Sequence, residues 1–168
     1  AEQSNIPTTV VDHRQFASRD LFDVTLAEAI DKYEPALIVL AGFMRILGAD
    51  FVKRYQGKIL NIHPSLLPDY PGTNTHQRVL DAGEKLHGVS VHFVTEELDG
   101  GPVIAQESIS IQSCDDVESL AIKTHEKEHL LYPIVASWFT DGRLRLDGNG
   151  AFLDEQLLPV TGKQIDTA

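Results

Sequence analysis

The sequence predicts an α/β fold built on a mixed β-sheet, mostly parallel, with antiparallel strands in the C-terminal half and helices on both faces. Strand-like and helix-like segments alternate in the first half of the chain. An uninterrupted apolar run at 36–42 is typical of a parallel strand that is buried on both faces. The segment 87–94 alternates in polarity with period two and precedes another strand-like segment, which indicates antiparallel pairing.

Local signals predict the first elements. The segment 6–11 is β-branched, and its Pro7 favours an edge strand. Ser18 can cap the N-terminus of a helix that closes before Pro35. The strand at 36–42 follows, and we expect it to have a neighbour on each side and cover on both faces.

The later elements follow in the same way. We expect short helices at 49–55 and 75–82, strands at 58–63, 87–94 and 101–106, a long helix starting at Asp115 or Asp116, and a hairpin of 143–146 with 151–153. Pro133 should kink or divide the long helix.

Composition favours a single domain. With 168 residues, of which 42% are hydrophobic, the chain is long enough for one substantial core and short for two. We therefore expect one domain over 1–160, followed by a polar tail at 161–168 that frays. The net charge of −11 disfavours binding to the phosphates of nucleic acids.

The sequence also predicts a reducing environment. Cys114 is the one cysteine, so the chain forms no intramolecular disulfide. No apolar run approaches the length that spans a membrane, and the first residues do not resemble a signal peptide. We therefore expect a cytoplasmic protein whose partners include neither nucleic acid nor membrane.

One group of polar residues suggests catalysis. Asn61 and His63 lie two apart at the end of a predicted strand, so their side chains point to the same side, and Asp99 lies in a glycine-flanked turn. Ligands of open α/β sheets bind at this end of parallel strands. An imidazole facing a carboxylate suits oxyanion stabilisation or proton transfer. The alternative is structural, with Asn61 capping a loop, His63 in the core and Asp99 in an ordinary turn.

Two further segments each allow two interpretations. The run from His125 to His129 matches the zinc-peptidase pattern H-E-x-x-H, but a charged, solvated helix face explains it more simply, and we expect no metal. The segment 42–48 places Arg45 among large apolar residues, either as part of the core or as the wall of a pocket for a flat heterocycle.

Four segments carry a resemblance to a known family. They are Ala41 to Leu47, Leu60 to Pro68, His87 to Val94 and Glu97 to Ile104. Together they closely resemble the folate-dependent formyltransferases, specifically the branch that acts on glycinamide ribonucleotide in purine biosynthesis, the phosphoribosylglycinamide formyltransferases. The Asn-x-His-Pro-Ser-Leu-Leu-Pro motif and the later Leu-Asp-x-Gly are shared with methionyl-tRNA formyltransferase and formyltetrahydrofolate hydrolase. They therefore indicate the reaction class better than the acceptor.

The resemblance implies a Rossmann-like formyltransferase fold and an enzyme that transfers a formyl group from its co-substrate 10-formyltetrahydrofolate to the amine of glycinamide ribonucleotide. Asn61 and protonated His63 would stabilise the oxyanion, and Asp99 would support the imidazolium and assist proton transfer. The resemblance leaves a homodimer open.

The resemblance also implies binding residues. The positions that match folate-binding residues are Arg19, Met44, Arg45, Ile46, Leu47, Asn61, Thr95, Glu96, Glu97, Leu98 and Asp99. The positions that match the ribonucleotide-binding region are Pro64, His125, Glu126, Lys127 and Glu128, which gives the His125 to His129 segment another explanation.

The sequence departs from the family at its start. Members begin with a strand, a glycine-rich phosphate-binding loop and a helix, and position 1 of this sequence corresponds to their second β-α unit. We therefore expect an N-terminally incomplete formyltransferase domain. Two alternatives remain: a non-catalytic folate-binding fragment, and a related formyltransferase or formyltetrahydrofolate hydrolase.

Overall fold

A computed structural model describes residues 1–148 and 150–166 of the chain. The helices are α1 (Arg19–Asp31), α2 (Ala49–Arg54), α3 (Thr75–Asp81) and α4 (Val117–Thr140), with 3₁₀ turns η1 (Glu2–Ser4) and η2 (His13–Gln15). The strands are β1 (Ile38–Leu40), β2 (Ile59–His63), β3 (Leu86–Phe93), β4 (Val103–Ser110), β5 (Leu144–Asp147), β6 (Gly150–Leu153), β7 (Gln156–Leu157) and β8 (Lys163–Gln164).

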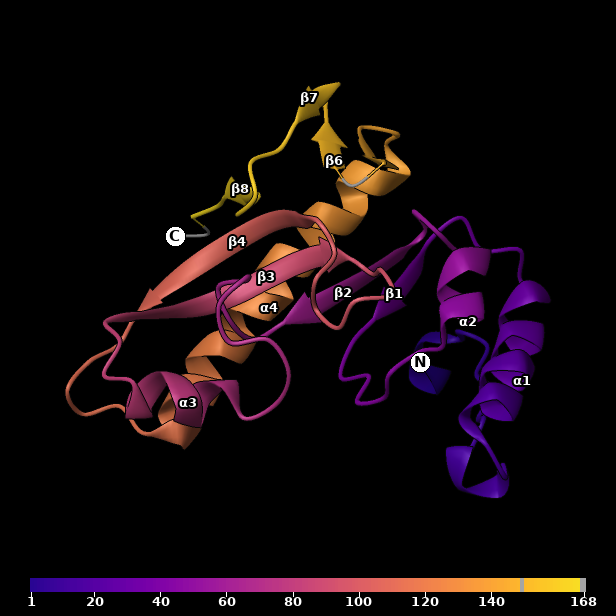
Figure 1. Ribbon diagram of the computed structural model, residues 1–168, viewed down its shortest axis with the longest axis horizontal. Coiled ribbons are helices and arrows are strands. Elements are labelled where there is room, and N and C mark those ends of the chain that lie inside the picture. Colours follow the sequence, from indigo (N-terminus) through magenta and orange to yellow (C-terminus); the bar gives the residue numbers. More distant parts are fainter. Residues whose placement is uncertain (149, 167–168) are drawn as a thin grey trace.

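The main sheet has the order β1-β2-β3-β4-β8, and a smaller sheet has the order β5-β6-β7 (Figure 1). In the main sheet, β1 pairs with β2 and β4 with β8 in parallel, whereas β3 pairs antiparallel with both β2 and β4. The predicted mixed sheet and the antiparallel pairing of its later strands are confirmed. The register places Asn61 opposite His92 and His63 opposite Ser90.

Helices cover both faces of the main sheet, as predicted. Along β2, Ile59 faces a cluster with α1 and α2, whereas Leu60 faces a cluster that includes Leu131 and Val135 of α4. In Figure 1, α4 crosses behind the sheet, and α1 and α2 lie beside β1. The alternation of a β-strand therefore divides the core into two layers, with β2 between them.

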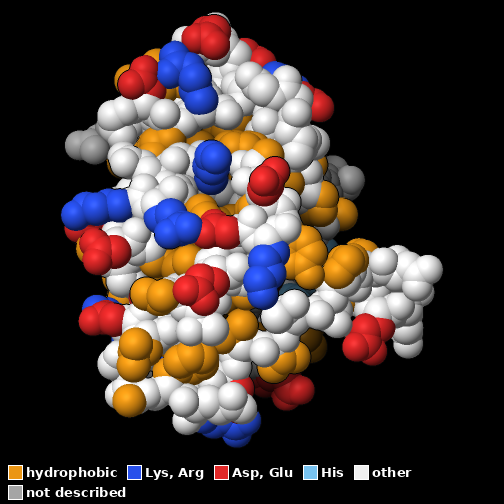
Figure 2. All heavy atoms as spheres, turned by 90° about the vertical axis from the view of Figure 1, so that its right-hand side faces the viewer, with side chains coloured by type: hydrophobic (Ala, Val, Ile, Leu, Met, Phe, Trp, Pro, Cys, Tyr) orange, Lys and Arg blue, Asp and Glu red, His pale blue; other side chains and the backbone are white. Residues whose placement is uncertain are grey.

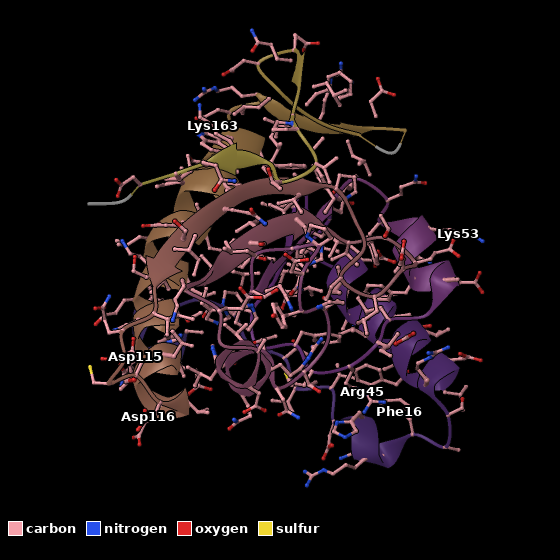
Figure 3. All side chains as sticks on the ribbon, turned by 60° about the vertical axis from the view of Figure 1, so that its left-hand side comes forward. Phe16, Arg45, Lys53, Asp115, Asp116 and Lys163 are labelled. Carbon is pink, nitrogen blue, oxygen red and sulfur yellow. The ribbon has the colours of Figure 1, made fainter. Side chains whose placement is uncertain are left out.

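The long helix α4 begins at a complete capping box. The side chain of Asp116 accepts a hydrogen bond from the Ser119 amide at 2.8 Å, and the Ser119 hydroxyl accepts one from the Asp116 amide at 3.0 Å. Figure 3 shows Asp115 and Asp116 at this end of the helix. The helix then continues for 24 residues with Pro133 inside it, so the proline does not divide it.

Three sequence-based expectations are wrong. Residues 6–11 form no strand in the described structure, where Pro7 has no N–H to donate. The apolar run at 36–42 contributes only the three residues of β1, which lies at an edge of the sheet with Val39 47% exposed. A run of apolar residues shows only that its side chains favour a buried strand. It does not show whether a second strand pairs with the other side of β1.

The third error concerns the tail. Lys163 and Gln164 form β8 and pair with Ala105 and Gln106 of β4, so this part of the predicted tail belongs to the sheet. Residues 167 and 168 of that tail lie outside the described residues.

The surface over α1 and α2 mixes acidic, basic and hydrophobic side chains (Figure 2). Leu21 and Val24 of α1 are more than half exposed there. Among the described residues, no helix has both the length and the apolar character needed to cross a membrane.

Tyr132 ties α4 to the two strands that carry the site. Its hydroxyl lies 2.9 Å from the carbonyl oxygen of Leu40 in β1 and 2.8 Å from that of Leu60 in β2, and burial raises its pKa. Replacing Tyr132 by phenylalanine removes the hydroxyl that donates to the carbonyl oxygens of Leu40 and Leu60. We expect Tyr132→Phe to lower the free energy of unfolding by about 1–3 kcal/mol, measured by urea denaturation. Tyr33→Phe, at a tyrosine that is 59% exposed, is the control, and equal losses in the two variants would contradict this role.

Candidate active site

A large cavity lies at the carboxyl ends of β1 and β2. Its volume is about 1080 Å³, and its walls come from the loops that follow these two strands, the start of α3, the turn before β4 and one side of α4. The lining residues are 41–46, 61–64, 72–77, 98–99, Val117, His125, Glu128, His129, Tyr132 and Pro133. This is the edge where ligands bind in open α/β sheets, as the sequence predicts.

The structure brings Asn61, His63 and Asp99 together in this cavity. The distance from His63 Nδ1 to Asp99 Oδ2 is 3.5 Å, and both side chains are largely buried. On its other side, His63 Nε2 lies 3.0 Å from the carbonyl oxygen of Tyr70. Each ring nitrogen thus faces an oxygen acceptor, and an imidazolium has an N–H for each.

Asp99 is held by the backbone as well as by histidine. The Gly72 amide donates a hydrogen bond to Asp99 Oδ2 at 2.8 Å. Asp99 also has a positive φ of 50°, a left-handed conformation that aspartate tolerates better than most residues. The turn predicted from the glycine-flanked Leu98-Asp99 segment therefore aims the carboxylate at the end of β2.

His92 completes the group, and sequence reasoning missed it. Its Nε2 lies 3.2 Å from the side-chain nitrogen of Asn61 and 3.8 Å from Asp99 Oδ1. Its Nδ1 lies 2.9 Å from the carbonyl oxygen of Phe93, and burial lowers the pKa of the ring. The antiparallel register of β2 and β3 places His92 across from Asn61, and the sequence alone does not give that register.

Most of the positions that match folate-binding residues surround two joined spaces. Met44, Arg45 and Ile46 line the large cavity. A smaller space of about 80 Å³ adjoins it through the residues the two share, and its further lining includes Leu47, Thr95, Glu96 and Glu97. Asn61, Leu98 and Asp99 line both spaces. Arg19 lines neither of them, and its guanidinium lies 4.0 Å from Asp20 on the same helix.

Arg45 lies over the ring of Phe22. Its guanidinium lies 5.1 Å from the centre of the Phe22 ring, and Phe16 meets the same ring edge-on at 5.8 Å. Figure 3 shows Arg45 and Phe16 in the same region of the molecule. The core interpretation of the segment 42–48 therefore applies to Leu47, which packs in the core. The pocket interpretation applies to Arg45, which is part of the cavity wall.

The positions that match the ribonucleotide-binding region separate into two groups. Pro64, His125 and Glu128 line the large cavity, with His125 Nδ1 3.1 Å from Glu128 Oε2. Glu126 and Lys127 do not line it, and Lys127 forms an ion pair of 2.5 Å with Glu107 of β4. One helix turn cannot direct four successive side chains to one side. Within the described residues, no cluster of three or more histidine, cysteine, aspartate or glutamate side chains is arranged to hold a metal ion.

A pair of histidines, His76 and His87, also borders the cavity and was not predicted. His76 lines the cavity from α3, and its Nδ1 lies 2.9 Å from Nε2 of His87. His87 is 1% exposed, and its Nδ1 has no hydrogen-bond partner among the described residues. Burial, with a smaller effect from the neighbouring histidines 76 and 63, lowers the pKa of His87 to about 4.

Comparison with known proteins identifies a family and several similar proteins. A family model described as formyl transferase matches residues 1–136. Phosphoribosylglycinamide formyltransferase of Escherichia coli strain K12 is 49% identical over 166 residues, which cover 99% of this chain and 78% of that protein. The protein of the same name from Haemophilus influenzae is 46% identical over 162 residues, or 96% of this chain and 76% of that protein. The solved structure of phosphoribosylglycinamide formyltransferase from Coxiella burnetii, in complex with CHES, has a TM-score of 0.94 and 52% identity, covering 98% of this chain and 78% of that one.

The buried His87 predicts acid sensitivity. Its pKa of about 4 in the folded protein lies below its ordinary value of 6.5, so the unfolded chain binds this proton more tightly. The contribution of His87 to stability is complete above pH 6.5 and is lost as the pH falls from there toward 4, at no more than about 1.4 kcal/mol per pH unit.

We therefore expect His87→Gln to reduce the difference in the free energy of unfolding between pH 7 and pH 5, measured by urea denaturation. Val89→Ala, at another buried residue of β3, should lower stability by a similar amount at both pH values. The assignment is wrong if His87→Gln and the unmodified protein lose the same stability between the two pH values.

Proposed function

This chain belongs to the formyl transferase family, and from that premise we propose that it transfers the formyl group of 10-formyltetrahydrofolate to the amine of glycinamide ribonucleotide. One observation supports the proposal most strongly: Asn61 and His63 at the end of β2 meet Asp99, which is distant in sequence, at one cavity. The shared motif alone leaves the acceptor substrate open. The names of the relatives above support glycinamide ribonucleotide as the acceptor.

The residues of the cavity suit acyl transfer without a covalent enzyme intermediate. The amine attacks the formyl carbon, a C–N bond forms, and the formyl oxygen becomes an oxyanion. Collapse of this tetrahedral intermediate breaks the bond between the formyl carbon and N10 of the folate. The amine loses one proton and N10 gains one, so the reaction is balanced by a proton transfer within the site.

Asn61 and His63 are proposed to stabilise the oxyanion. Both line the cavity at the end of β2, and His63 would turn its Nε2–H from the Tyr70 carbonyl to the oxyanion while Nδ1 stays on Asp99. A donor fixed in advance at such a place lowers the barrier by about 3 kcal/mol, because it needs no reorganisation when charge develops. Asp99, 3.5 Å from His63, is proposed to hold the imidazolium and to assist the proton transfer.

The two joined spaces suggest how the substrates divide the site. We assign the folate ring to the side lined by 44–47 and 95–99, where apolar walls and backbone groups suit a flat heterocycle. We assign the ribonucleotide to the side of Pro64 and Glu128. The roles of Arg19, Glu126 and Lys127 stay predictions.

The mechanism predicts a large effect of single substitutions at the end of β2. We expect His63→Ala and Asn61→Ala each to lower kcat by about 10²- to 10³-fold, because each removes a donor to the oxyanion. Formyl transfer from 10-formyltetrahydrofolate to glycinamide ribonucleotide is the measurement. Unchanged turnover in His63→Ala would refute the mechanism.

The same samples separate the alternatives. Calorimetric binding of a folate analogue without turnover would favour a non-catalytic folate-binding fragment. Release of formate without an acceptor would favour a hydrolase.

The position of Glu128 predicts that its substitution changes the binding of the ribonucleotide and not that of the folate. Its carboxylate lines the cavity on the ribonucleotide side and can accept hydrogen bonds from hydroxyl groups. We expect Glu128→Gln to raise KM for the ribonucleotide about tenfold while KM for the folate changes little, as for the loss of one hydrogen bond to a charged group. Glu118→Gln, on an exposed position of the same helix, is the control. An equal change in both KM values would contradict the assignment.

A further inference from the structure

We propose that His92 is a positioning residue, a neutral imidazole whose unprotonated Nε2 fixes the orientation of the Asn61 amide. This inference rests on the proposed function, in which Asn61 is a donor to the oxyanion. It assigns His92 no contact with substrate and no role in carrying the reacting proton. Its effect on the reaction passes through Asn61 alone.

The backbone places the two side chains together. Asn61 and His92 are directly opposite in the antiparallel β2–β3 ladder, where facing side chains are in contact range. The β3–β4 register shifts between Val91 and His92, an irregularity of the kind that re-aims a side chain beside a site. The result is a distance of 3.2 Å between the Asn61 side-chain nitrogen and His92 Nε2.

The surroundings of His92 assign its protons. A carbonyl oxygen only accepts hydrogen bonds, so the 2.9 Å contact of Nδ1 with Phe93 places a proton on Nδ1. In the neutral ring Nε2 then carries a lone pair, and the Asn61 amide nitrogen can donate to it. The opposite tautomer would leave two donors facing each other at Nε2 and two acceptors facing each other at Nδ1.

Charges around His92 act in both directions. Asp99, at 3.8 Å from Nε2, favours the charged ring, whereas burial and the neighbouring His63 disfavour it. Burial is the largest of these effects and lowers the pKa of His92, in agreement with the neutral state that the geometry requires.

Fixing this amide has a chemical consequence. The nitrogen and oxygen ends of an asparagine side chain are nearly equal in size, so packing alone does not choose between them. A lone pair on His92 accepts from the nitrogen end and repels the oxygen end. One N–H of the Asn61 nitrogen is thereby held by His92, and the other, which has no partner among the described residues, is left for the oxyanion. A flipped amide would bring an oxygen to the oxyanion instead.

Two substitutions of His92 distinguish the role of Nε2 from that of Nδ1. In His92→Gln, the longer side chain can place an amide oxygen near the position of Nε2 and keep an acceptor for Asn61. In His92→Asn, the shorter side chain can replace only Nδ1. We expect His92→Gln to keep kcat within about fivefold of the unmodified protein and His92→Asn to lower kcat by about 30- to 100-fold. KM for the folate should change little in both variants, because a misplaced Asn61 amide slows the reaction more than it weakens binding.

A double substitution tests whether the effect passes through Asn61. The loss caused by His92→Asn should largely disappear in an Asn61→Ala background, since the group that His92 orients is then absent. Equal losses in the two single variants, or the same loss with and without Asn61, would overturn the inference. His92→Gln should also keep the pH profile of kcat, and a displaced acid limb would show that His92 carries a proton.

The outcomes also separate this inference from the proposed function. Normal turnover in Asn61→Ala would contradict the proposed role of Asn61 itself. Reduced turnover in Asn61→Ala together with normal turnover in His92→Asn would overturn only the inference on His92. Urea denaturation of each variant checks folding, and His92→Gln keeps the test decisive if His92→Asn does not fold.

Discussion

The pairing of β2 with its two neighbours is the constraint on which the rest of the structure depends. β2 pairs in parallel with β1 and antiparallel with β3, so its residues alternate between two core layers until the strand ends. At that end Asn61 and His63 line the cavity instead of the core. Because each face of β2 is packed by different helices, a slip of one residue would move both groups out of the site.

The loop after β2 is held by a buried polar network. The Ser90 hydroxyl accepts a hydrogen bond from the Leu67 amide at 3.0 Å and donates one to the Ser65 carbonyl at 2.6 Å. Gln106 of β4 donates to the Leu67 carbonyl at 2.6 Å. This fixes the segment that presents the Tyr70 carbonyl to His63 and the Gly72 amide to Asp99. The site is therefore positioned by strands β3 and β4 as much as by β2.

Histidines dominate the polar chemistry of the cavity. The chain carries a net charge of −11, yet histidines 63, 76, 125 and 129 line the cavity, and 87 and 92 lie directly behind it. Histidine offers a donor, an acceptor or a positive charge according to its surroundings. The environment of each ring decides which: Phe93 assigns the proton of His92, and burial keeps His87 neutral at ordinary pH.

The sequence by itself determined the α/β class, most helix and strand positions and the group of Asn61, His63 and Asp99. Capping residues, apolar periodicity and glycine-flanked turns are local signals, and the two residues at the end of β2 share a side because strand geometry has period two. Only the tertiary structure decided which strands pair and in which register. It placed β1 at an edge and added β8 to the sheet. It also brought His92 to Asn61 and directed Glu128, but not Glu126 or Lys127, to the cavity. These outcomes depend on packing between segments far apart in the chain, for which local periodicity carries no signal.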